Sequence, residues 1–550
     1  MSFNGSGEIS LLFSKVVRYS TIFLYPFFYS GKKEDFVKAL TETGSWLPQK
    51  FEPQVMFPEY AYFQPVIRDF LFSQEDVDKR PVVYLRYKLT KKNQDIEGNK
   101  LFFQVKYPEN SFFNFKEILG ENLTRNYPID SIQISVFPFG VGILAIQVEQ
   151  EFKYENEAIN FQEVLCFNEL ARRTSPSFDY EKQKSCGLLP DKVSLVIGKD
   201  NEVLKSNNNL TSEENFEFKE TNLGLIKEGH IGVSNTIKFL LQPLKNANVF
   251  DAEDKSEPRF QTALDERMIV YSYVCLKRDD IVTLRKVDKD FLNLILVDKE
   301  WGGSFGNDDL IEGYIKKHAY DNWIDYGTRY GFSNYSGVIL TLSNFNASPD
   351  DFNLRILYSH FETMYYEIAL LTFFYKTALL RFSSESAICA KMFYESIEDR
   401  LRSNKEEVYR KVKKLRTDFL YFTNKYWFAE LTYQVQGIDI FDKWKVVTEI
   451  ENLFLQVDKE ISELEEYIDR EQSTHLNLVL YFLAAAAVLG VIFTWILDYC
   501  YYLISANKLS SEMILIVVLF GFSSILLFFF HSGYRSWVIR LLKRVFHNIE

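Results

Sequence analysis

Two uncharged apolar segments near the carboxyl end constrain this chain more than any other feature of its sequence. Residues 476–497 and 513–530 are runs of 22 and 18 residues without Asp, Glu, Lys or Arg. As helices they would be about 33 and about 27 Å long, close to the roughly 30 Å of bilayer hydrocarbon. Water-soluble proteins rarely contain two adjacent segments of this kind. We therefore expect a membrane protein with two spans rather than two helices buried in a soluble core.

The charges that flank these segments predict their orientation. The connecting residues 498–512 contain a single basic residue, whereas residues 531–550 contain four. Basic segments next to a span remain in the cytoplasm. Residues 1–15 lack the apolar core of a signal peptide. We expect a multi-pass protein with cytoplasmic N- and C-termini, and with residues 498–512 as the outer loop.

The composition excludes several classes of protein. With 47% hydrophobic and 25% charged residues, the chain is not intrinsically disordered. A net charge of −12 argues against direct binding of nucleic acid. The five cysteines are odd in number and form no C-x-x-C pair, and the six histidines have no metal-ligand spacing, so metal ligands stay unknown. Phosphate-loop, dinucleotide-binding and hydrolase motifs do not occur, and we expect no enzyme.

Hydrophobic periodicity predicts an α+β fold. Strand-like runs at residues 129–149, 193–198, 268–277 and 337–342 indicate a sheet, and residues 129–149 indicate a hairpin turning at Pro138 and Gly140. Helical patterns follow at residues 354–382, 385–431 and 438–471. The expected parts are an α/β sensor domain (1–345), a helical stalk (346–475), a first span (476–497), an outer loop (498–512), a second span (513–530) and a basic cytosolic tail (531–550).

The first span carries a stripe of polar and small residues on one helical face. Its members lie seven positions apart or three residues further on. They are Asn477, Ala484, Ala487, Val491, Thr494 and Asp498. A stripe that is polar at both ends and small in the middle is typical of a pore lining, although small residues also permit plain tight helix packing. Both interpretations stay open at this stage.

An apolar seam with alternating spacings of three and four residues occupies residues 447–468. It predicts packing against the chain's own preceding helix, against another subunit, or against both. On the opposite side, Glu449, Glu463 and Glu466 continue the polar stripe, and residues 442–471 contain ten acidic and four basic residues. This side is expected to form an acidic inner vestibule that concentrates cations, unless it is an ordinary solvated helix face.

The order of these parts resembles the CorA family of metal-ion channels, which assemble as pentamers. The resemblance covers roughly the last 200 residues and includes the text EQSTHLNLVLYFLAAAAVLGVI at residues 471–492. It fails at the signature Gly-Met-Asn that closes the first span in the family, because residues 495–502 read WILDYCYY. The family's filter for hydrated magnesium therefore cannot be transferred to this chain.

Residues 135–146, 326–340, 360–383 and 426–437 look like the divergent CorA-like proteins of type III CRISPR systems. That resemblance implies a homopentameric channel in the bacterial inner membrane that acts in antiviral defence. Its implied ligand is a nucleotide second messenger, either the conjugate of S-adenosylmethionine and AMP (SAM-AMP) or a cyclic oligoadenylate. The alternatives are a constitutive transporter of a divalent cation such as magnesium, and a scaffold that the spans merely tether to the lipid bilayer.

Four residues are candidates for binding an anionic nucleotide. Guanidinium groups bind phosphate through paired hydrogen bonds, and Arg172, Arg173 and Arg329 could supply them. Tyr330 could stack on a base. Each of these residue types is also common in purely structural positions.

Overall fold

The computed structural model describes residues 10–52, 56–88, 100–109, 111, 113–174, 189–198, 215–217, 233–246, 259–264, 267–278, 284–298, 308–398 and 405–505. The chain divides into two compact units, Met1–Leu464 and Glu465–Glu550. The strands are β1 (Val16–Tyr29), β2 (Trp46–Pro48), β3 (Val83–Tyr87), β4 (Lys100–Lys106), β5 (Thr124–Phe137), β6 (Val141–Glu151), β7 (Lys192–Gly198), β8 (Asn215–Glu217), β9 (Lys245–Asn246), β10 (Arg259–Thr262), β11 (Ile269–Lys277), β12 (Ala319–Tyr320), β13 (Thr328–Ser333) and β14 (Ser336–Ser343).

The α-helices are α1 (Lys33–Thr41), α2 (Phe57–Tyr62), α3 (Pro65–Leu71), α4 (Phe115–Leu119), α5 (Phe161–Ala171), α9 (Asn235–Leu240), α10 (Asp288–Leu296), α11 (Asp308–His318), α12 (Leu357–Glu362), α13 (Met364–Glu398), α14 (Lys405–Lys425), α15 (Val435–Thr448) and α16 (Ile450–Ser505). The strands come first in the chain, and long helices follow them. The predicted α+β class is confirmed.

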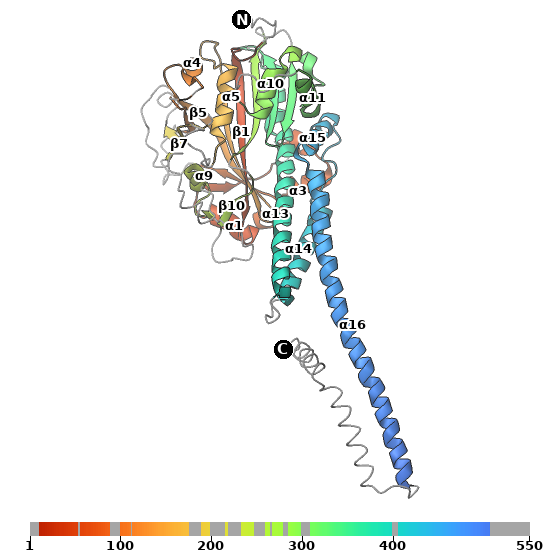
Figure 1. Cartoon of the computed structure of the whole chain (residues 1–550). Coiled ribbons are helices and arrows are strands. Elements are labelled where there is room, and N and C mark those ends of the chain that lie inside the picture. The colour runs from red at the N-terminus through yellow and green to blue at the C-terminus, as the bar shows by residue number, and fades with distance from the viewer. Residues whose placement is uncertain are drawn as a thin grey trace. The chain divides into compact units, whose positions relative to one another are not determined.

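One large sheet forms the core of the first unit (Figure 1). Its main path runs β12-β13-β14-β11-β1-β6-β5-β4-β7-β8, so β1 lies between β6 and β11 and pairs antiparallel with both. All fourteen residues of β1 are buried. A strand with no exposed residue must be covered on both faces of its sheet, which explains its nearly continuous apolar and aromatic sequence.

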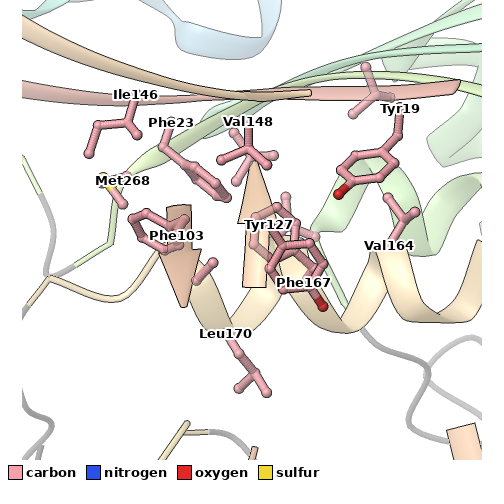
Figure 2. Packing of buried hydrophobic residues seen from close by; sticks show 14 of the residues in the cluster. Tyr19, Phe23, Phe103, Tyr127, Ile146, Val148, Val164, Phe167, Leu170 and Met268 are labelled. Carbon is pink, nitrogen blue, oxygen red and sulfur yellow. The ribbon is translucent and has the colours of Figure 1, made fainter. Parts of the chain in front are cut away.

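Helix α5 covers one face of this sheet. Figure 2 shows its Phe167 among rings that the strands supply. The Phe167 centroid lies 3.9 Å from that of Tyr127, 5.5 Å from Phe23 and 6.4 Å from Tyr19. Because side chains alternate along a strand, the odd-numbered residues Tyr19 and Phe23 of β1 share this face.

Helices α12 and α13 pack on the other face. Arg18 of β1 donates from Nη1 to the carbonyl of Leu354 at 3.1 Å, and its guanidinium lies over the ring of Tyr358 in α12. Further along, Phe374 of α13 stacks on Phe137 of β5 at 4.5 Å. The sheet is therefore the middle layer between two layers of helices.

The predicted hairpin at residues 129–149 is confirmed as β5 and β6. Its turn has Phe139 at φ 58° and Gly140 at φ 65°. An added Cβ on Gly140 would lie 2.7 Å from the carbonyl oxygen of Tyr29, so both the backbone conformation and the space require glycine. The strands expected at 193–198, 268–277 and 337–342 are also present, as β7, β11 and β14.

The predicted helix boundaries are partly wrong. Helix α13 continues without interruption through residues 383 and 384, where the sequence pattern predicted a break. The helix expected at residues 438–471 is divided in two, because Glu449 adopts the left-handed conformation between α15 and α16. The downstream helix runs on without interruption through residues 476–497, as expected from the sequence, and ends at Ser505.

The apolar seam of α16 packs against the chain's own helical segment within the first unit. Val457 and Ile461 are fully buried. The ring of Phe454 stacks on Trp427 at 4.6 Å and lies 5.6 Å from Phe419 of α14. Packing against the preceding helices, one of the two partners proposed from the sequence, is therefore present.

Among the described residues, one helical segment is long and apolar enough to cross a membrane. It is Leu476–Tyr499 of α16, with a mean hydropathy of 2.4. At 1.5 Å per residue its 24 residues would extend about 36 Å. The second predicted span, residues 513–530, and the basic tail lie outside the described residues, as do residues 506–512 of the expected outer loop. Residues 498–505, expected to belong to that loop, are helical and form the end of α16, so this part of the loop prediction is wrong.

Substitution of Phe167 tests the described packing of the core. We expect Phe167→Ala to lower the free energy of unfolding by about 3–5 kcal/mol, because it removes a fully buried ring from a cluster of aromatic side chains. Urea denaturation of the full chain in detergent measures this change. The control Phe13→Ala removes a ring that is 63% exposed and should change stability by less than about 0.5 kcal/mol; equal effects would contradict the described packing.

Candidate functional site

The end of α5 places an arginine inside the protein. Nearly every residue of α5 is buried against the sheet, and Arg172 is its C-terminal cap. This side chain is only 4% exposed, although a guanidinium ordinarily reaches solvent. A cation at a helix C-terminus is stabilised by the helix dipole, which explains in part why the position is tolerated.

Arg172 leaves most of its hydrogen-bonding capacity unused. Its Nη2 donates to the carbonyl oxygen of Val297, after the end of α10, at 3.4 Å. Its Nε and Nη1 have no hydrogen-bond partner among the described residues. Buried polar groups are almost always paired, and an unpaired buried charge is strongly unfavourable. An anion bound here would remove that penalty.

Two further arginines surround Arg172. Arg173 is 8% exposed, and its backbone forms an isolated antiparallel β-bridge with that of Arg267. The backbone N–H of Met268 donates to the carbonyl of Arg172 at 2.7 Å. Burial, then Arg173 and Arg267, lower the pKa of Arg172 to about 10, while Glu169 acts in the opposite direction. We call Arg172, Arg173 and Arg267 the arginine cluster.

Tyr335 also lies beside the arginine cluster. The Cζ atom of Arg172 lies 5.2 Å from the centroid of its ring, and that of Arg267 lies 6.0 Å away. Both distances fall within the range of cation–π attraction. The ring therefore holds two guanidinium groups near each other despite their like charge, and the Nε and Nη1 groups of Arg172 keep no hydrogen-bond partner among the described residues.

Arg329 and Tyr330, the other two residues predicted to bind a nucleotide, lie in different surroundings. Arg329 is 1% exposed and its guanidinium makes four hydrogen bonds, to both carboxylate oxygens of Asp321, to Asp288 and to the carbonyl of Leu284. The hydroxyl of Tyr330 accepts a hydrogen bond from Gln436 at 2.7 Å, and its ring is 98% buried. These groups are engaged within the fold, so we do not place them in the candidate site.

The residues predicted to line a pore all lie on α16. Asn477, Ala484, Ala487, Val491, Thr494 and Asp498 each have an exposed side chain in the single chain. The hydroxyl of Thr494 donates to the carbonyl of Val491 at 2.8 Å, so its own helix satisfies it.

The residues predicted to line an inner vestibule do not share one uninterrupted helix. Glu463 and Glu466 are exposed on α16 and pair with Lys459 and Arg470 respectively. Glu449 precedes α16 at the left-handed break, so a heptad count from Glu463 back to Glu449 crosses a change of helix. The assumption of a continuous stripe is corrected at that residue.

An acidic group on the opposite face of the sheet has the spacing of a cation site. Carboxylate oxygens of Asp130, Glu149 and Glu362 lie within 4.8 Å of one another. Glu149 already accepts from Nε of Arg18 at 3.1 Å, and Glu362 accepts from Gln147 at 2.7 Å. These bonds connect β1 and β6 to α12, and they explain the cluster as a structural network.

A pair of acidic residues, separate from that cluster, is buried between α2 and α13. Glu59 is 6% exposed and Glu367 is 5% exposed, and Tyr84 of β3 donates to Glu367 at 2.9 Å. Neither carboxyl group forms an ion pair with any basic residue among the described ranges. Burial raises the pKa of Glu59 to about 7, and burial together with the nearby Glu59 raises the pKa of Glu367 well above its usual range.

The acidic pair predicts a pH dependence of stability. A raised carboxyl pKa means that the folded state favours the protonated form, so stability is lost as pH rises from about 4.5 to about 7. We expect Glu59→Gln to stabilise the full chain at pH 8 by about 3 kcal/mol and to have little effect near pH 4. Urea unfolding at both pH values tests this, with Glu117→Gln, at an exposed position of α4, as control. An unchanged pH profile in Glu59→Gln would refute it.

No known protein family, curated protein or solved structure matches the chain. The candidate site therefore depends on its own geometry. The sequence pattern identified Arg172 and Arg173, whereas Arg267 and Tyr335 were missed. They lie about a hundred residues or more away along the chain, and no local spacing signals that the sheet brings them to the end of α5.

Proposed function

We propose that this chain is a CorA-like membrane effector that an anionic nucleotide second messenger controls. In this proposal several copies, five by analogy with CorA, assemble in the bacterial inner membrane. SAM-AMP or a cyclic oligoadenylate binds the first unit, and the spans then perturb the membrane or its ion balance. The setting would be type III CRISPR antiviral defence.

The buried, incompletely paired guanidinium of Arg172 is the observation that carries this proposal. A phosphate group accepts paired hydrogen bonds from a guanidinium, and Arg172 has two N–H-bearing atoms, Nε and Nη1, with no partner among the described residues. Nucleotides with phosphodiester or pyrophosphate groups have this chemistry. A divalent cation would instead be repelled by these three arginines.

The apolar segment of α16 supports the membrane part of the proposal. A single helix, Ile450–Ser505, contains both the seam residues that pack in the first unit and the candidate span Leu476–Tyr499. A helix is a stiff element, because every backbone group inside it is hydrogen-bonded to the next turn. In this proposal, a ligand-dependent change at the first residues of α16 is passed along the helix to the candidate span.

The first test removes the anion-binding group. We expect Arg172→Gln in full-length protein to weaken binding of SAM-AMP or cyclic oligoadenylate by roughly tenfold or more, because hydrogen bonds to a charged group are lost. Binding is measured by calorimetry, and leakage of a trapped dye from proteoliposomes reports the response. The control Arg285→Gln changes an exposed arginine that pairs with Asp325 and should leave both readouts intact.

The proposal fails if wild-type proteoliposomes leak no ions or solutes with these nucleotides, or if Arg172→Gln responds as wild type does. Metal uptake without any messenger would instead support the constitutive divalent-cation transporter.

The second test separates a pore from a simple membrane tether. If the stripe on α16 lines a passage, Asn477→Leu and Asp498→Ala should reduce nucleotide-dependent leakage several-fold and leave nucleotide affinity unchanged. Single-channel recording or dye release measures the change. For a tether, both variants and even replacement of the spans by unrelated ones should preserve activity.

A further inference from the structure

The β13–β14 hairpin contacts the arginine cluster through its turn. Tyr335, in that turn, carries the ring that faces Arg172 and Arg267. Its carbonyl accepts a hydrogen bond from the backbone N–H of Val270 at 3.0 Å, so β11 also holds the turn. An anion that draws either guanidinium away from Tyr335 weakens the cation–π contact that this ring makes.

Asn334, the other residue of this turn, contacts helix α13. The Nζ of Lys376 in α13 donates to the side-chain oxygen of Asn334. Burial lowers the pKa of Lys376 to about 8, and the negative charge of Glu449 opposes that shift. Lys376 is thus hydrogen-bonded to the hairpin turn, and its charge is attracted by that of Glu449 at the junction between α15 and α16 without forming an ion pair with it among the described residues.

The body of the hairpin also supports α15. Trp444 of α15 is fully buried, and its ring lies 5.1 Å from that of Phe332 in β13. It packs so closely on β14 that a Cβ added to Gly337 would lie 2.4 Å from its ring. At the other end of α15, Gln436 donates to the hydroxyl of Tyr330 at 2.7 Å. A displacement of the hairpin would therefore move α15.

Glu449 is the residue at which α15 can change direction relative to the first turn of α16. It has φ 56° and ψ 29°, a left-handed conformation that glutamate rarely adopts. Strained backbone of this kind is frequent in elements that switch between two states. Ile450, the next residue, is fully buried and begins α16.

We infer that the Asn334–Tyr335 turn transmits anion binding at the arginine cluster to Glu449 through Lys376 and Trp444. The inference rests on the proposed function, because it requires the cluster to bind an anion. The bound anion competes with Tyr335 for the guanidinium groups, the turn shifts, and the backbone at Glu449 favours a different conformation. Binding at two sites that are coupled in this way is reciprocal, so a change at Lys376 must also alter anion affinity.

The experiment uses full-length protein in detergent, with pyrophosphate as probe at constant ionic strength. Hydrogen exchange of the amides of residues 446–452 is measured with and without pyrophosphate. We expect exchange there to change in the wild type and to stay unchanged in Lys376→Met. We also expect Lys376→Met to alter pyrophosphate affinity roughly fivefold or more, although Lys376 does not contact the cluster.

Two variants complete the design. Glu449→Gln keeps the side-chain shape without the charge and should reproduce the loss of coupling if Lys376→Met folds poorly. Lys391→Met removes an exposed lysine of the same helix, one that pairs with Glu395, and should behave as wild type.

The outcomes distinguish the inference from the proposed function. If wild-type protein does not bind pyrophosphate, the arginine cluster is not an anion site, and both ideas are overturned. If pyrophosphate binds but exchange at residues 446–452 is unaffected, or equally affected in Lys376→Met and Glu449→Gln, the transmission route is wrong and the anion site stands.

Discussion

Burial of β1 on both faces is the constraint on which the rest of the first unit depends. Its fourteen residues are covered by α5 on one side and by α12 and α13 on the other. Burial on this scale stabilises the sheet by roughly 25 cal/mol for each Å² of apolar surface removed from water. Arg172, the residue after the last turn of α5, is only 4% exposed.

The contrast between two buried arginines defines the candidate site. Arg329 is as buried as Arg172, but two aspartates and a carbonyl group neutralise and pair it. Arg172 has one long hydrogen bond and lies beside two more arginines. Leaving one buried charge without a counter-ion is destabilising, whereas a fully paired one is close to neutral. This difference separates a structural arginine from one that an anion would stabilise.

Local patterns predicted many elements correctly and others only roughly. The β5–β6 hairpin followed from alternating apolar residues around Gly140, because strand period and turn chemistry depend on near neighbours. The predicted helix ends were less accurate. Helix α13 continues through the polar residues Ser383 and Ser384, because tertiary packing rather than local propensity stabilises most helices in proteins. The break at Glu449 had no local signal, because a glutamate in the left-handed conformation is imposed by the structure around it.

The sequence alone predicted the class of fold, the apolar segment at residues 476–497, and Arg172 and Arg173 as two of the four candidates for binding an anion. Only the tertiary structure decided which arginines are paired, and it brought Arg267 and Tyr335 to the end of α5. The physical reason is that backbone periodicity is encoded by residues a few positions apart. The partner of a buried charge is set by distances through space, which the order of strands in the sheet fixes.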